Sequence, residues 1–409
     1  MNRRDFIKYG SMSSLVILSD NAGFAKKIHT LSAKKIQPLA ITMWDFSWLE
    51  RRWPGGSYED WDKALDELVA RGYNAVRIDA YPHLVSVDPT KEWTLLPVWD
   101  QYDWGAPGII KVKIQPSLTE FIAKCKKHKV KVGLSTWYRQ DVDNTRLTVH
   151  TATKMANNWL AVLDIIKQEN LLDNILYVDL CNEWPADVWT PFFKAKRDGH
   201  NWTLPESITW MKEAMEIMHK QYPQIPFTFS FDHYQEGILK NNPTPYLDFI
   251  EQHIWMASLN KGEFNNKVGI DWNNFSSGDL KRLAEKSETL YKGNKPYWDN
   301  ILTISINQFA ADAKAANQPL ITTECWGIVN YKDYPMLNWD WVKGLCELGI
   351  TTAAATGQWV AIGTSNFCGP QFKGMWQDIA WHKKMTGIIK NAGIDSGLKT
   401  KKIISRMQD

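Results

Sequence analysis

Eight apolar, β-rich segments alternate with amphipathic helical segments along most of the 409-residue chain. The candidate strands are residues 38–45, 73–83, 130–139, 175–183, 226–234, 247–255, 319–327 and 350–360. This alternation, with no hairpin signal between the strands, is typical of parallel strands joined by crossover helices. A doubly wound open sheet is the alternative, but no strand is followed by a glycine-rich phosphate turn. We therefore predict an α/β protein whose fold class is a (β/α)₈ TIM barrel.

The composition shows no break that would separate two domains. We expect one barrel over residues 36–395 and a C-terminal tail over residues 396–409. In the first predicted helix, residues 57–72, Ser57 has the character of an N-cap. The polar stretch 255–295 predicts a loop insertion at the carboxyl-terminal face, and insertions of that length are usually functional or mobile.

The chain begins MNRRDFIKYG, and a mildly apolar run too short to span a bilayer follows this twin arginine. The pattern resembles a Tat-type signal peptide over residues 1–25, cleaved after Ala25. We expect a periplasmic or secreted protein without a membrane anchor after signal removal. A basic leader with no export role is the alternative.

The formal net charge of +3 and the absence of a long basic run give no argument for nucleic acid as a partner. The five cysteines include no C-x-x-C pair or zinc-type spacing, so we expect no metal and no other cofactor. The 22 tryptophans suit sugar stacking and core packing equally well. The sequence leaves the oligomeric state open.

Two glutamates close predicted strands on opposite sides of the barrel: Glu183 ends the fourth strand and Glu324 ends the seventh. The carboxyl ends of barrel strands face the active-site mouth, so these carboxylates are expected to converge over the barrel axis. Glycoside hydrolysis requires two such groups, one as proton donor and one as nucleophile. The alternative is that each is a solvated strand-end residue.

Several of these strand-end residues match a known pattern. Asn182-Glu183 and Glu324, together with Arg77, His253 and Trp359 in this order, resemble the clan A retaining glycoside hydrolases. Within that clan the chain is most similar to glycoside hydrolase family 5 and cellulase-like proteins, over about residues 38–392. The resemblance implies a barrel that binds carbohydrate.

The resemblance also implies a role for each matching residue. Glu183 is expected to act as acid/base and Glu324 as nucleophile, with Asn182 on the sugar 2-hydroxyl. Arg77 is expected to keep Glu324 ionised, and an ion pair with Asp79 is its alternative. His253 would orient the acid/base region and Trp359 would form the floor of the −1 subsite; core packing is the alternative for both.

The sequence departs from the family pattern at two positions. Trp255 stands where the family has tyrosine, and Tyr234 or Tyr138 could replace it. The third strand ends in Ser135-Thr136-Trp137, where many relatives have histidine. We count Trp255, Tyr234, Trp137 and Trp326 as further candidates for substrate binding.

Other polar strand-end residues match no family role. Asp45, His83 and Asp232 could bind an outer hydroxyl or pair with Arg139.

These residues together predict a retaining β-glycoside hydrolase that acts by double displacement on a glucan-like polysaccharide or oligosaccharide. A transglycosylase that uses the same carboxylates is one alternative, and a non-catalytic carbohydrate-binding barrel is another. The sugar, the linkage and exo or endo action stay open. The Trp-rich segment 91–105 could close one end of the cleft, which would favour exo action on short chains.

Overall fold

A parallel sheet of nine short strands forms the centre of the structure, a computed structural model that describes residues 36–98, 102–194, 201–232, 236–271 and 274–408. In sheet order the strands are β7 (Phe227–Thr228), β6 (Ile175–Asp179), β5 (Lys131–Ser135), β2 (Ala75–Asp79), β1 (Leu39–Asp45), β13 (Trp359–Gly363), β11 (Leu320–Thr322), β9 (Ile250–Gln252) and β8 (Ser230–Phe231). The first and last of these, β7 and β8, are consecutive pieces of one segment interrupted at Phe229. The sheet therefore closes on itself, and the predicted (β/α)₈ barrel is confirmed.

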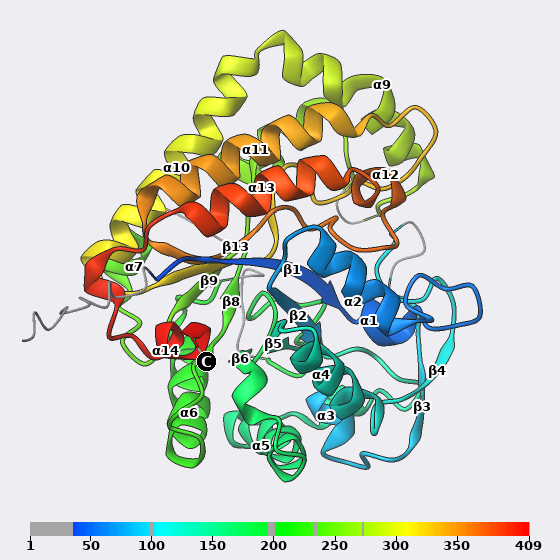
Figure 1. The fold of residues 1–409 in the computed structure, drawn as a ribbon, viewed down its shortest axis with the longest axis vertical. Coiled ribbons are helices and arrows are strands. Elements are labelled where there is room, and N and C mark those ends of the chain that lie inside the picture. The colour runs from blue at the N-terminus through cyan, green and yellow to red at the C-terminus, as the bar shows by residue number, and fades with distance from the viewer. Residues whose placement is uncertain (1–35, 99–101, 195–200, 233–235, 272–273, 409) are drawn as a thin grey trace, which may run out of the picture. The chain divides into compact units, whose positions relative to one another are not determined.

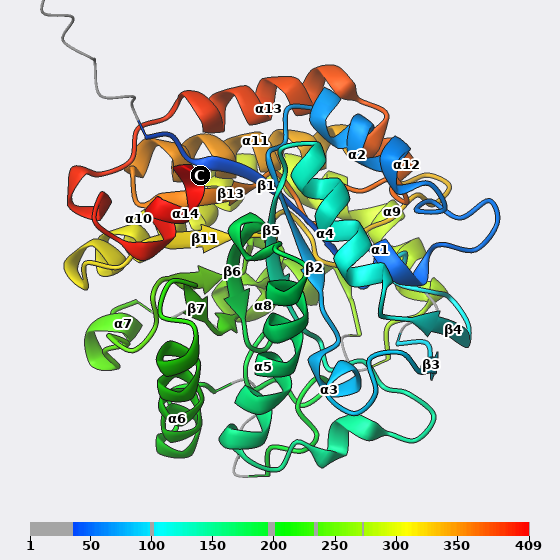
Figure 2. The same cartoon turned by 60° about the horizontal axis from the view of Figure 1, so that its bottom comes forward.

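Helices surround the barrel, as Figure 1 and Figure 2 show from two directions. The longer ones are α2 (Trp61–Ala70), α4 (Ser117–Lys127), α5 (Ala152–Gln168), α6 (Pro205–Gln221), α10 (Lys295–Ala315), α11 (Trp339–Thr356) and α13 (Ile379–Asn391). In α5 the buried residues Trp159, Val162 and Ile166 recur at helical spacing, so one face packs inward. The strands are buried on both faces, which explains why they form nearly continuous apolar runs in the sequence.

Further elements are inserted between the barrel units or follow the last of them. They are α1 (Ser47–Glu50), α3 (Pro82–Val85), β3 (Glu92–Leu95), β4 (Ile110–Lys113), η1 (Thr145–Thr148), η2 (Leu172–Asn174), α7 (Ile238–Asn241), β10 (Ile254–Trp255), η3 (Met256–Ser258), α8 (Leu259–Val268), α9 (Ser277–Gly293), β12 (Cys325–Trp326), α12 (Lys373–Trp376), η4 (Ser396–Leu398) and α14 (Lys402–Gln408). The antiparallel pair β3–β4 was not expected, because the sequence showed no hairpin signal. The stretch 255–295 is largely helical rather than a loop, through η3, α8 and α9.

The eighth strand lies later in the chain than the sequence predicts. Residues 350–356, part of the expected strand 350–360, form the last two turns of α11, and Gly357 ends that helix with a φ of 70°. Gly349, just before this run, lies against the ring of Trp326, so the helix packs closely on the core at this point. Strand β13 begins only at Trp359. Trp359 therefore lies at the amino end of the barrel strand, and the expectation that it lies at the mouth is wrong.

Two further boundaries differ from the sequence analysis. Asp60, not Ser57, caps α2, because its side chain accepts a hydrogen bond from the amide of Lys63. The expected tail 396–409 contains α14, which packs against β6. The Arg406 side chain donates to the carbonyl of Ile175, so this segment is part of the barrel rather than separate from it.

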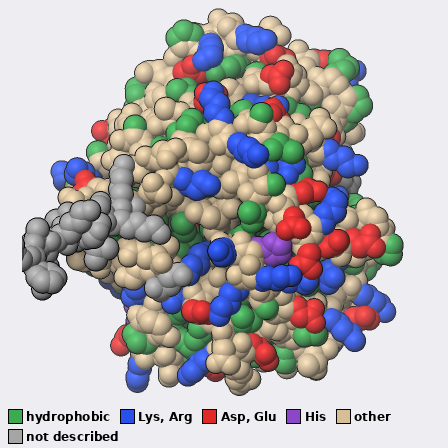
Figure 3. All heavy atoms as spheres, in the orientation of Figure 1, with side chains coloured by type: hydrophobic (Ala, Val, Ile, Leu, Met, Phe, Trp, Pro, Cys, Tyr) green, Lys and Arg blue, Asp and Glu red, His purple; other side chains and the backbone are tan. Residues whose placement is uncertain are grey.

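The surface carries charges of both signs. On the face shown in Figure 3, basic and acidic side chains are interspersed, which agrees with the small net charge of +3. No helix in the described part of the chain has the length and apolar character needed to cross a bilayer. The proposed signal peptide, residues 1–25, lies outside the described residues, and export stays a prediction.

The packing of α11 on Trp326 can be tested with two glycines of the same helix. A Cβ at Gly349 would lie 2.6 Å from ring atoms of Trp326, whereas one at Gly344 would meet nothing within 4 Å. We expect Gly349→Ala to lower the free energy of unfolding by about 1–3 kcal/mol, because it overpacks the core. Gly344→Ala should raise it by about 0.5–1 kcal/mol, because alanine favours the helix. Urea denaturation measures both, and equal effects of the two substitutions would contradict this packing.

Candidate active site

A cavity of about 670 Å³ opens at the carboxyl-terminal mouth of the barrel. Its described lining consists of Tyr102, Trp104, Trp137, Glu183, Asp187, Val188, Trp189, Asp232, Trp255, Ser258, Glu324, Val329 and Asn330. Aromatic side chains and carboxylates dominate this lining. Its size is typical of a cavity that binds a small molecule or a short segment of a polymer.

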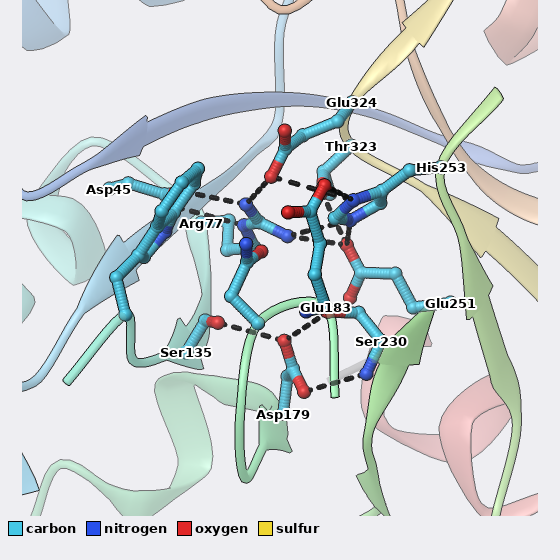
Figure 4. A network of polar contacts seen from close by, with 12 residues as sticks. Asp45, Arg77, Ser135, Asp179, Glu183, Ser230, Glu251, His253, Thr323 and Glu324 are labelled. Atoms are coloured by element: carbon cyan, nitrogen blue, oxygen red, sulfur yellow. Dashed lines mark hydrogen bonds and ion pairs between the residues drawn. The ribbon is translucent and has the colours of Figure 1, made fainter. Parts of the chain in front are cut away.

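The Arg77 side chain on β2 is the centre of the polar network beneath the cavity (Figure 4). Its guanidinium donates to Asp45 through Nε at 2.9 Å and Nη2 at 2.6 Å, to Glu324 Oε1 through Nη2 at 2.6 Å, and to Glu251 Oε1 through Nη1 at 3.0 Å. The side chain is completely buried. One cation thus holds three carboxylates that come from three different strands.

The alternative partner of Arg77 that the sequence suggested was Asp79. The hydrogen bonds of Asp79 go instead to the backbone amides of Tyr81, at 2.7 Å, and Trp137, at 2.8 Å. The expected contact between Arg77 and Glu324 is present, but it does not keep Glu324 ionised at neutral pH, because burial raises the pKa of this carboxyl to about 8 despite the guanidinium.

His253 lies between the two glutamates that the sequence singled out. Its Nδ1 is 3.1 Å from Glu183 Oε1 and 3.7 Å from Glu324 Oε1, and its Nε2 is 3.9 Å from Glu251 Oε1. Strand six is interrupted at His253, between β9 and β10, and strand seven is interrupted at Thr323 and Glu324, between β11 and β12. These interruptions place His253 and Glu324 side by side beneath the cavity.

The short distances within this cluster raise the question of a metal. One atom each of Glu183, His253 and Glu324 lies within 4.8 Å of the other two. The Arg77 guanidinium, however, already contacts Glu324 Oε1 at 2.6 Å and approaches His253 Nε2 at 3.3 Å. A divalent ion would therefore share its ligands with a permanent cation, and the cluster suits shared protons better than a metal.

Glu183 is held from three sides. Its φ is 50°, a left-handed conformation that is uncommon for a residue with a side chain. Its amide donates to Ser230 Oγ at 3.0 Å, and Ser230 Oγ donates in turn to the buried Asp179 at 2.9 Å. Trp189 Nε1 donates to Glu183 Oε2 at 3.2 Å. The backbone turn and these partners direct the carboxylate into the cavity.

Burial changes the protonation of the cluster. It raises the pKa of Glu324 to about 8, against the opposing effects of His253 and Arg77 and with help from Glu183. Burial alone would lower the pKa of His253, but Glu324, Glu183 and Glu251 together raise it to about 10. These groups interact strongly, so their titration belongs to the cluster. The site therefore retains protons at neutral pH.

Asn182, next to Glu183, is completely buried. Its Nδ2 and Oδ1 have no hydrogen-bond partner among the described residues. An unpaired buried amide costs folding free energy, so such a group usually awaits a partner that binds.

The structure brings together Arg77, Glu183, His253 and Glu324, and it places Trp137 and Trp255 in the cavity lining. Trp326 and Trp359 lie elsewhere, and the prediction of a substrate platform for them is wrong. Their ring centroids are 6.1 Å apart and both side chains are fully buried, with Trp326 packed against α11. Tyr234 lies outside the described residues.

The unassigned candidates also have definite positions. Asp45 pairs with Arg77, not with Arg139, and also accepts the indole N–H of Trp137. The His83 ring contacts the backbone carbonyl of Arg139 at 2.9 Å, and Asp232 lines the cavity. Tyr138 does not replace the missing tyrosine, because its hydroxyl donates to the carbonyl of Leu180 at 3.4 Å.

Sequence reasoning missed two groups of residues. Glu251 and Asp179 lie inside apolar strand segments, so neither stood out as a strand-end residue. Trp189 follows Glu183 by six positions in a segment with no strand signal. Tyr102 and Trp104 belong to the Trp-rich segment that the sequence marked as a possible wall of the cleft, and both do line the cavity.

Comparisons with known proteins agree with this fold and site. A family model described as sugar-binding cellulase-like matches residues 41–390. A candidate glycoside hydrolase from Parabacteroides distasonis is 51% identical, with a TM-score of 0.89, over 91% of this chain and 100% of its own.

More distant structures share the fold alone. The cellulose synthase subunit Z of Clostridioides difficile is 12% identical, with a TM-score of 0.50, over 86% of this chain and 99% of its own. A cellulase in complex with an inhibitor is 14% identical, with a TM-score of 0.51, over 85% of this chain and 92% of its own. No curated protein matches the chain.

The raised pKa of Glu324 predicts how stability depends on pH. A carboxyl with a pKa of about 8 in the folded protein binds its proton more tightly there than in the unfolded chain, where the value is 4.5. Its burial therefore lowers stability progressively as the pH rises from about 4.5 to about 8. We expect Glu324→Gln to raise the melting temperature at pH 8 and to have a smaller effect at pH 5. Thermal unfolding at both pH values measures this, and a larger gain at pH 5 would contradict it.

Proposed function

The chain belongs to the sugar-binding cellulase-like family, and we propose that it is a retaining β-glycoside hydrolase acting on a glucan-like polysaccharide or oligosaccharide. The observation that carries this proposal is the short separation of Glu183 and Glu324, of which one oxygen each lies within 4.8 Å. Retaining enzymes hold their two carboxyl groups about 5–5.5 Å apart, whereas inverting enzymes leave about 6.5–9.5 Å for a water molecule.

The proposed reaction has two steps. Glu324 attacks the anomeric carbon while Glu183 protonates the departing oxygen, and a glycosyl–Glu324 ester results. Glu183 then takes a proton from water, which attacks the anomeric carbon and releases Glu324. The first step requires Glu324 to be a carboxylate and the shared proton of the cluster to lie on Glu183, and His253 Nδ1, 3.1 Å from Glu183 Oε1 and 3.7 Å from Glu324 Oε1, links the two groups for this transfer.

The surroundings of the two carboxylates support these roles. Arg77 contacts Glu324 Oε1 at 2.6 Å and stabilises its charged form during departure of the sugar. His253 and Trp189 contact the two oxygens of Glu183 and fix its orientation. The unpaired amide of Asn182 is adjacent in the chain and suits a hydroxyl of the sugar at the reacting position.

The cavity lining supports a carbohydrate substrate. Tyr102, Trp104, Trp137, Trp189 and Trp255 present aromatic rings together with N–H and O–H groups. Their apolar faces suit the faces of sugar rings, while the indole N–H groups of Trp137 and Trp189 are already donated to Asp45 and Glu183. The same lining would suit a sugar acceptor, so transglycosylation through the same ester is the second candidate function.

Substitution of the two glutamates tests the proposal. We expect Glu183→Gln to lower kcat by about 100- to 10,000-fold on substrates with poor leaving groups, because proton transfer is lost. Glu324→Gln should abolish turnover, because the nucleophile is lost. Glu213→Gln, on the exposed face of α6, is the matched control and should leave kcat unchanged. Aryl β-glycosides and β-glucans serve as substrates.

The stereochemistry of the first product decides the mechanism. Proton NMR of fresh reaction mixtures should show a β-anomer, and an α-anomer would contradict retention. Addition of a sugar acceptor separates hydrolysis from transglycosylation by the products formed. Binding of glycans by the wild type without any turnover would contradict the enzyme and favour a binding protein.

A further inference from the structure

Glu251 is a third carboxylate beneath the two proposed catalytic glutamates. It lies on β9, and its side chain is completely buried in the barrel interior. Its Oε1 accepts a hydrogen bond from Arg77 Nη1 at 3.0 Å and another from the hydroxyl of Thr323. Figure 4 shows Glu251 below His253, with its carboxylate toward Arg77.

Both hydrogen-bond partners of Glu251, Arg77 and Thr323, are direct neighbours of Glu324. Arg77 Nη2 contacts Glu324 Oε1 at 2.6 Å, so Glu251 and Glu324 hold the two ends of one guanidinium. Thr323 is the residue before Glu324 in the chain, so the second hydrogen bond fixes the backbone from which the Glu324 side chain extends. Glu251 thus contacts both the side chain that binds the Glu324 carboxylate and the residue that precedes Glu324 in the backbone.

We propose that Glu251 is a positioning residue that aims Glu324 at the anomeric carbon by holding Arg77 and Thr323. The catalytic meaning of this assignment rests on the proposed function. Glu251 itself touches no part of the cavity lining and takes no part in bond making.

The contribution of Glu251 to the free energy of folding does not by itself explain its presence. Its Oε2 is buried and has no hydrogen-bond partner among the described residues, which costs folding free energy. A buried ion pair as a whole is often replaceable by apolar residues without loss of stability, so stability alone does not explain why a carboxylate occupies this position. The active-site geometry, in contrast, depends on groups held in place by partners of this kind.

Glu251 also differs from the other carboxylates around Arg77 in its protonation. Burial raises its pKa, but Arg77, His253 and Thr323 lower the pKa by more, so it falls below its usual range. The pKa values of Asp45 and Glu324 are raised, in both chiefly by burial. Glu251 therefore remains a hydrogen-bond acceptor for both Arg77 and Thr323 over the pH range in which the neighbouring acids titrate.

A competing role would run through His253 to Glu183. The distance from His253 Nε2 to Glu251 Oε1 is 3.9 Å, longer than the 3.0 Å contact with Arg77. The two roles differ in which step they affect. Loss of the nucleophile's position slows attack for every leaving group, whereas loss of the proton donor's position matters mainly for poor leaving groups.

Two variants separate the position of Glu251 from its charge. Glu251→Asp keeps the charge but withdraws the carboxylate by one methylene, and we expect kcat to fall by about 10- to 100-fold with KM nearly unchanged. The loss should be equal for dinitrophenyl and for alkyl β-glycosides. Glu251→Gln keeps an oxygen within reach of Arg77 and Thr323 and should recover most of kcat. Glu50→Asp, the same change in another fully buried carboxylate held by an arginine, is the matched control and should change kcat much less.

Three results would overturn the proposal: a loss in Glu251→Gln as large as in Glu251→Asp, a loss confined to poor leaving groups, or full activity of Glu251→Asp. Crystal structures add a readout that needs no turnover. The contact between Arg77 Nη2 and Glu324 Oε1 should be broken in Glu251→Asp and kept in Glu251→Gln, and its persistence in both overturns the proposal. A wild-type protein without activity on any glycoside would contradict the proposed function, while the crystal structures still decide the role of Glu251.

Discussion

The buried guanidinium of Arg77 is the interaction on which the rest of the site depends. A charge so far from water is tolerable only if it is paired and hydrogen-bonded. Arg77 meets this condition by contacts to Asp45, Glu251 and Glu324, which come from the first, sixth and seventh strands of the barrel. Removal of any one carboxylate changes the charge balance around Arg77 and therefore the electrostatic environment of the other two. The strand ends are therefore coupled electrostatically as well as through the sheet.

The backbone conformation at the mouth of the barrel also places side chains in this polar cluster. Each of the first four barrel strands ends at, or is followed within four residues by, a residue with positive φ, namely Asp45 (32°), Tyr81 (49°), Tyr138 (43°) and Glu183 (50°). For such side chains the left-handed region costs free energy, and it is commonly found at functional sites. Here it turns the chain sharply at the end of the strand, so that Asp45 reaches Arg77 and Glu183 reaches His253. Packing of the surrounding barrel offsets the free energy that these backbone conformations cost.

The sequence predicted the parts of the fold that depend on local pattern. Alternating apolar runs and helical periods gave the barrel, and Glu183 and Glu324 were recognisable because each ends such a run. Trp359 was misplaced because residues 350–356 combine alanine with β-branched residues, a composition compatible with a strand, whereas in the structure they continue α11, which packs on the core through Gly349 and Trp326. The role of Glu251 could not be predicted, because it lies inside an apolar strand and only the fold brings Arg77, from a different strand, next to it.

The charge balance of the cluster explains why this barrel interior can support proton transfer. Four carboxylates, Asp45, Glu183, Glu251 and Glu324, face two basic groups, Arg77 and His253. If all six were charged, the buried cluster would carry an excess of two negative charges, which a medium of low polarity disfavours. Retained protons relieve this excess, in agreement with the raised pKa values of Asp45 and Glu324. The pKa of Glu251 is lowered while that of Glu324 is raised, so a retained proton is favoured on Glu324, which lines the cavity where a bound glycoside would lie.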